Sequence, residues 1–175
     1  PSFSGTGFVF EGDQGLFAST LVVGAGPEQV SGSAYEEGEW VNPEPLAITA
    51  PVSGFDLAFG TAFDDSGAPN PIGLEVDLVS SSSTMDEQDD FIILEYSVEN
   101  TTDTELSNIY VGIFADWDVG AATANLGGFD AETNLLYVYD DGGAPNYYGA
   151  AVLDGPVSGY SLSAGAGMNP DEFDI

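Results

Sequence analysis

Hydrophobic and polar residues alternate with a period of two in several short runs of the chain. Leu74, Val76 and Leu78 alternate with acidic residues, and apolar residues also recur at every second position over residues 92–98 and 109–117. Successive side chains of a β-strand point to opposite faces of its sheet. The pattern therefore predicts strands that bury one face.

Glycine and proline separate these runs, with 23 Gly and 10 Pro in the chain. Both residues are typical of turns between strands. No stretch has the spacing of an amphipathic helix. The sequence predicts an all-β protein, an antiparallel two-sheet β-sandwich of about ten strands, jelly-roll or immunoglobulin-like. Further strands are expected at residues 7–10, 16–23, 46–49, 55–61, 135–139, 148–153 and 159–163.

The length of 175 residues suits one domain with a sizeable core. We expect a single β-sandwich domain over residues 1–163, followed by a linker or assembly arm over 164–175. The apolar Phe173 and Ile175 in this arm are suited to docking on a neighbour's sheet edge. Because the chain begins at Pro1, we expect a processed chain or an excised piece of a longer protein.

The charge of the chain is entirely acidic. It has no Lys, Arg or His against 30 Asp and Glu, a formal net charge of −30 at pH 7. Nucleic-acid binding and attraction to an anionic membrane are therefore excluded, and no apolar run is long enough for membrane insertion. Histidine-dependent catalysis and a P-loop are excluded as well. With no Cys either, zinc sites built from Cys and His cannot form.

Because the chain has no cationic side chain, every carboxylate must be solvated, hydrogen-bonded, protonated or bound to an outside cation. Self-repulsion is expected to weaken the fold at low salt, and screening or bound Ca²⁺ is expected to relieve it. This favours a salty, calcium-containing setting, at the cell surface or in extracellular fluid. A chain without Lys or Arg also resists proteases that cut after these residues.

The strongest calcium candidate follows the run at 109–117. Asp116 and Asp118 lie two residues apart, so their side chains project to the same side of a strand end. Asn125 and Asp130 supply further oxygen ligands of the kind Ca²⁺ prefers. The segment lacks the closing Glu and the flanking helices of an EF-hand. The alternative is a solvated strand end with Trp117 in the core.

Two similar sequence segments each contain a pair of Asp residues. Asp64 and Asp65 begin DDSGAPNPIG, and Asp140 and Asp141 begin DDGGAPNYYG. One interpretation is that each pair holds a cation. The other is that two strand corners use similar turn residues.

Aromatic residues are candidates for sugar binding, because an aromatic face packs against the CH groups of a pyranose ring. The candidates are Trp40, Tyr147 and Tyr148. The alternative is that they belong to the core of the sandwich. Tyr147 and Tyr148 are adjacent, so they point to opposite faces of a strand. A glycosidase needs only two carboxylates at a set separation, but with thirty carboxylates some pair fits by accident.

The stretch from Phe91 to Leu153 resembles a module of large secreted bacterial proteins. The residues that carry the resemblance are ILEYSVENTT at 93–102, NIYVGIFADWD at 108–118, NLLYVYD at 134–140 and YGAAVL at 148–153. Such proteins often carry a subtilisin-like protease and a sorting segment for type IX secretion. The resemblance implies a non-catalytic, extracellular β-rich module. The total absence of basic residues departs from this family's pattern.

These observations lead to one functional expectation and two alternatives. We expect an extracellular, non-enzymatic structural β-sandwich, a self-associating subunit of a surface fibre or sheath or a neighbour of other domains in a secreted protein. The first alternative is a carbohydrate-binding or adhesive module. The second is a carboxylate-dependent glycosidase.

Overall fold

The computed structural model describes residues 3–4, 9–10, 12–32, 38–86, 88–121, 124–140, 142 and 146–162. This part of the chain is all-β, as the sequence predicted, and it has thirteen strands and no α-helix. The two-sheet sandwich of about ten strands stays a prediction. The strands are β1 (Phe3–Ser4), β2 (Val9–Phe10), β3 (Asp13–Gln14), β4 (Leu16–Gly26), β5 (Gln29–Ser31), β6 (Ala47–Ile48), β7 (Leu57–Asp64), β8 (Leu74–Ser82), β9 (Ile93–Asn100), β10 (Tyr110–Trp117), β11 (Asn125–Asp130), β12 (Leu135–Asp140) and β13 (Tyr147–Ala151).

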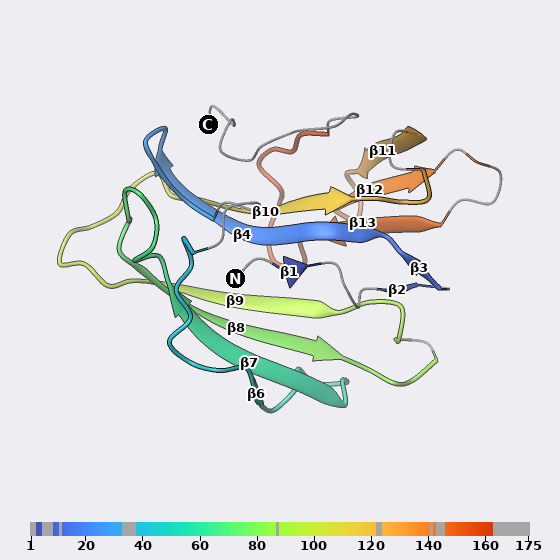
Figure 1. Cartoon of the computed structure of the whole chain (residues 1–175), viewed down its shortest axis with the longest axis horizontal. Helices are drawn as coiled ribbons and strands as arrows, with labels where there is room; N and C mark the ends of the chain where they lie inside the picture. The colour runs from blue at the N-terminus through green and yellow to red at the C-terminus, as the bar shows by residue number, and fades with distance from the viewer. Residues whose placement is uncertain are drawn as a thin grey trace. The chain divides into compact units, whose positions relative to one another are not determined.

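The strands form three larger sheets and one short ladder. One sheet has the order β6-β7-β8-β9, and a second has the order β1-β4-β10 with β5 also paired to β4. The third has the order β11-β12-β13, while β2 pairs only with β3. Figure 1 shows β7, β8 and β9 side by side as neighbouring antiparallel strands.

Contacts within the chain divide it into two compact units. Among the described residues, unit 1 covers residues 20–113, and unit 2 covers residues 3–19 and 114–162. Strands β4 and β10 therefore contribute residues to both units. The predicted single domain over residues 1–163 stays a prediction.

The core of unit 1 follows from the alternation in β8. Leu74, Val76 and Leu78 are buried, whereas the intervening Glu75 and Asp77 are exposed. The registers of β7 and β9 place Phe63 and Val98 beside Val76, and Tyr96 beside Leu78. Burying such a side chain contributes roughly 1.5–3 kcal/mol, so this face provides much of the unit's stability.

Strand β9 carries a half-buried tyrosine, Tyr96. Burial raises the pKa of Tyr96 to about 12. The native state therefore favours the neutral phenol. The stability that the neutral Tyr96 phenol contributes is fully present below the ordinary pKa of 10.0. This contribution is lost as the pH rises toward about 12.

In unit 2, a tight connection joins β11 to β12. Asp130 accepts hydrogen bonds from the Thr133 hydroxyl (2.7 Å) and the Glu132 N–H (3.0 Å). These bonds, the hydroxyl first, lower the pKa of the Asp130 carboxyl. Asn134 has a φ of 53°, the left-handed conformation that Asn tolerates better than most residues. The local sequence thus fixes the register of this hairpin.

Most of the predicted strands lie within a few residues of the observed ones. Strand β11 was not predicted, because its glycines, Gly127 and Gly128, interrupt the alternation. The segment predicted as a strand at 159–163 is not one over residues 159–162. There Tyr160 stacks on Phe129 with ring centroids 4.4 Å apart, and packing rather than strand pairing holds the segment.

Candidate functional site

Three tyrosines gather on one face of the β11–β12–β13 sheet. Tyr137 and Tyr139 are two residues apart in β12, so they share a face. Tyr147 in β13 lies directly opposite Tyr139 in the antiparallel register. We call Tyr137, Tyr139 and Tyr147 the tyrosine platform.

The three rings of the tyrosine platform contact one another as a continuous group. The ring centroids of Tyr139 and Tyr147 are 5.0 Å apart with an interplanar angle of 29°. Tyr137 lies 6.3 Å from Tyr139 and 6.2 Å from Tyr147. Tyr147 is 59% exposed, and Leu126, which lies opposite Tyr139 in β11, is 44% exposed. The platform is therefore accessible from solvent.

Two glycines flank Tyr137, and one of them, Gly128, leaves room for its ring. Gly128 and Gly149 are its register partners in β11 and β13. A Cβ at Gly128 would lie 2.5 Å from the Tyr137 hydroxyl oxygen and 2.7 Å from Cζ. The ring of Tyr137 therefore lies across Gly128, close to the sheet backbone.

The tyrosine platform combines apolar ring surface with phenolic hydroxyls. Such a surface can pack against the CH face of a sugar while the hydroxyls donate and accept hydrogen bonds at the edge. It has no nucleophile–base pair. The arrangement is suited to binding.

Two residues predicted to bind ligands lie instead in the core. Trp40 is 8% exposed, packs edge-on against Phe63 at 5.2 Å, and donates its Nε1–H to the Leu21 carbonyl at 3.0 Å. Its polar group is satisfied internally, as is usual for a buried Trp. The prediction that Trp40 offers a sugar-binding surface is therefore wrong, because its ring is buried.

Tyr148 is the second of these residues. It is 5% exposed and lies 5.8 Å from Trp117 and 6.2 Å from Phe10, measured between ring centroids. A Cβ at Gly15 would come within 2.4 Å of its ring. Adjacent residues of a strand face opposite ways, so Tyr148 is buried whereas Tyr147 is exposed.

The structure gives Asp65 a role unlike the predicted cation ligand. Its carboxylate is 2% exposed and accepts hydrogen bonds from three consecutive N–H groups, those of Ile72 (2.6 Å), Gly73 (3.2 Å) and Leu74 (2.8 Å). The Ser31 hydroxyl donates a fourth bond at 3.0 Å. With its oxygens occupied and buried, Asp65 organises the loop between β7 and β8.

Asp64 differs from its buried neighbour. Its Oδ1 accepts the N–H of Ser66 at 2.8 Å, a local turn of the kind Asp commonly makes. Asp140 likewise accepts the Ala121 N–H at 3.3 Å. Asp141 lies outside the described residues.

Within the Asp116–Asp130 candidate, Asp130 lies apart from Asn125. Asn125 binds the loop after β10, accepting the Val119 N–H at 3.1 Å and donating to the Val119 and Ala121 carbonyls. Asp130 lies at the other end of β11, about 16 Å further along the strand. Asp118 donates its backbone N–H to the Gly15 carbonyl at 2.9 Å.

Within the described ranges, no group of three or more carboxylates is arranged to hold a metal ion. Binding of Ca²⁺ therefore stays a prediction, without an assigned site. The predicted assembly residues Phe173 and Ile175 also lie outside the described residues.

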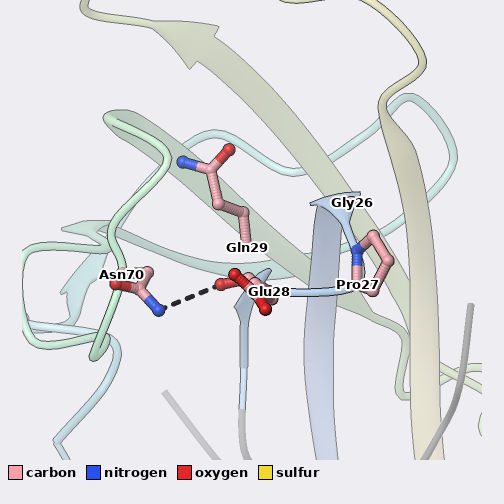
Figure 2. Close-up of a pocket in the computed structure, with 5 residues that line it drawn as sticks. All are labelled: Gly26, Pro27, Glu28, Gln29 and Asn70. Atoms are coloured by element: carbon pink, nitrogen blue, oxygen red, sulfur yellow. Dashed lines mark hydrogen bonds between the residues drawn. The ribbon is translucent and has the colours of Figure 1, made fainter.

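A hollow lies beside the β4–β5 turn in unit 1. Figure 2 shows its lining of Gly26, Pro27, Glu28, Gln29 and Asn70. Asn70 donates its side-chain amide to the Glu28 carbonyl at 3.1 Å, which ties the β7–β8 loop to this turn. Among the described residues of the lining, Glu28 is the only carboxylate, so these residues do not supply the carboxylate pair that a glycosidase needs.

The comparisons with known proteins give no match. No family model matches the chain, and neither a curated protein nor a solved structure shows significant similarity to it. Over the residues that the structure describes, no helix has the length and apolar character needed to cross a membrane.

Sequence reasoning singled out Tyr147 but missed Tyr137 and Tyr139. The signal was present, because the YVYD segment of the expected strand at 135–139 places both tyrosines on one face. The sequence does not reveal the strand register that places β13 beside these two tyrosines.

Proposed function

We propose that this chain is a non-catalytic, extracellular β-sandwich module that binds carbohydrate through the tyrosine platform of Tyr137, Tyr139 and Tyr147. The observation that carries the proposal is the contact among three tyrosine rings beside the exposed Leu126. Isolated exposed aromatics are ordinary, but a contiguous aromatic surface is typical of a recognition site.

The resident side chains agree with a binding role. The chain has no His, Lys, Arg or Cys to act as a general base, cationic clamp or thiol nucleophile. Its resemblance to a module of secreted bacterial proteins adds an extracellular location. In such a setting, the module would hold its parent protein on a polysaccharide surface.

Replacing Tyr147 by alanine is expected to weaken binding to a recognised oligosaccharide about tenfold, or about 1.4 kcal/mol. Tyr147→Phe should retain most of the affinity, because the ring face is kept. The measurement is titration calorimetry against ligands chosen by a glycan array, supported by pull-down on insoluble polysaccharides.

Tyr110→Ala is the matched control, since Tyr110 is 55% exposed but lies in β10, outside the tyrosine platform. Its affinity should equal that of the unmodified chain. Binding to no glycan, or equal losses in the Tyr147→Ala and Tyr110→Ala variants, would refute the carbohydrate proposal.

A self-associating structural subunit is the second candidate function, and strand β10 favours it. This strand ends the order β1-β4-β10, and Tyr110, Val111 and Ile113 are 55%, 55% and 45% exposed. An exposed apolar edge strand is a template for pairing with another chain. The occupant we propose is a second copy, with salt screening its charge.

Sedimentation velocity at high salt would test this assembly. The unmodified chain is expected to form oligomers that dissociate as the salt concentration falls. Val111→Lys should remain a monomer, because an edge lysine opposes strand pairing. Val152→Lys makes the same charge change at a residue that is 46% exposed and outside the strands. Monomers at every salt concentration would contradict assembly.

A further inference from the structure

The residue inventory leaves this chain few ways to form a covalent cross-link. It has no Cys for a disulfide and no Lys for an isopeptide bond. It has 8 Tyr, whose phenols can couple oxidatively. An extracellular domain commonly gains stability from cross-links between distant residues, so tyrosine is the residue to consider here.

The geometry selects one tyrosine pair. Tyr139 and Tyr147 are direct partners across β12 and β13, and their centroids, 5.0 Å apart, are the closest of any tyrosine pair in the described part of the chain. With Tyr147 59% exposed, an oxidant can reach the pair from solvent. Tyr160 and Tyr148 instead pack on Phe129 and Trp117.

We propose that Tyr139 and Tyr147 form an intrachain dityrosine cross-link when the chain meets hydrogen peroxide and a haem peroxidase. Each phenol loses one electron and one proton to give a tyrosyl radical. The two radicals couple through ring carbons next to the hydroxyls. The two displaced ring hydrogens then move as protons to the ring oxygens, which restores both phenols. One peroxide is reduced to two waters, so the product is lighter by two hydrogen atoms.

The cross-link would close the end of the β12–β13 hairpin around residues 140–146. Joining two residues that are already paired in the native register constrains mainly the unfolded chain. The oxidised monomer should therefore melt at a higher temperature than the untreated one. This inference does not depend on carbohydrate binding.

The test is to treat the full chain with peroxide and peroxidase at low protein concentration and to isolate the monomer. The monomer should show dityrosine fluorescence, with a yield independent of protein concentration. A protease that cuts after acidic residues separates Tyr139 from Tyr147, because Asp140 and Asp141 lie between them. Mass spectrometry should then find the two peptides joined.

Conservative variants make the inference falsifiable without unfolding the chain. Tyr147→Phe should reduce the monomer's fluorescence to background, whereas Tyr110→Phe and Tyr160→Phe should leave it unchanged. Fluorescence confined to oligomers would overturn the proposal. It would also be overturned if Tyr147→Phe had no effect or if Tyr110→Phe had an equal one.

Discussion

Replacing Asp65 by asparagine is expected to lower the free energy of unfolding by about 3 kcal/mol. The carboxylate accepts the N–H groups of Ile72, Gly73 and Leu74 together with the Ser31 hydroxyl. An asparagine keeps one acceptor oxygen but turns an N–H₂ group toward donors. At a position only 2% exposed, water cannot replace the lost acceptor.

Chemical denaturation at one fixed, high salt concentration is the appropriate measurement, because it separates this effect from the change in net charge. Asp64→Asn is the matched control, since it removes the same charge from a residue with one local side-chain bond. Ser31→Ala should cost about 1 kcal/mol, as it removes a single donor. If Asp65→Asn were as stable as Asp64→Asn, the buried carboxylate would not organise the loop.

Asp65 illustrates how a chain without cationic side chains accommodates its acids. Elsewhere in unit 1, Glu39 accepts the Gly32 N–H at 2.7 Å, and Asp56 accepts the Thr84 hydroxyl at 2.7 Å. Backbone N–H and hydroxyl groups thus take the place of Lys and Arg. Hydrogen bonds to an ionised acceptor are stronger than neutral ones, so these contacts hold loops without ion pairs.

The alternation of side chains made the strand content of this chain predictable. The pattern of Leu74, Val76 and Leu78 is local, and it reports directly which face of β8 is buried. The same reasoning placed Tyr147 and Tyr148 on opposite faces, but it could not say which face was the core. That depends on Trp117, far away in the sequence, which packs on Tyr148.

The candidate site was less predictable, because it depends on pairing between strands. The tyrosine platform requires the register that sets Tyr147 opposite Tyr139, and Gly128 opposite Tyr137. Charge misled the interpretation of Asp65, since a paired acid in a loop resembles a cation ligand. Its burial under the N–H groups of the β7–β8 loop is a tertiary feature that composition does not reveal.

Salt is expected to have the second large effect on this protein. Raising NaCl from about 0.01 M to about 1 M shortens the Debye length from about 30 Å to about 3 Å. Thirty acidic side chains with no cationic side chain then repel one another far less. A relief of about 3 kcal/mol would raise the melting temperature by about 10 °C for a chain of this size. Scanning calorimetry at pH 7 over a salt series measures the shift.

Melting experiments with and without Ca²⁺ distinguish charge screening from specific cation binding. At matched ionic strength, screening predicts the same melting temperature in NaCl and in choline chloride. A specific site would add a shift that saturates with Ca²⁺ concentration and is reversed by a chelator. A melting temperature unchanged across the NaCl series would contradict the repulsion argument, since the folded chain holds its negative charges closer together than the unfolded chain does. If NaCl raises the melting temperature and Ca²⁺ adds no further shift, the general ion atmosphere balances most of the charge. Backbone N–H groups then hold the few carboxylates that the fold buries.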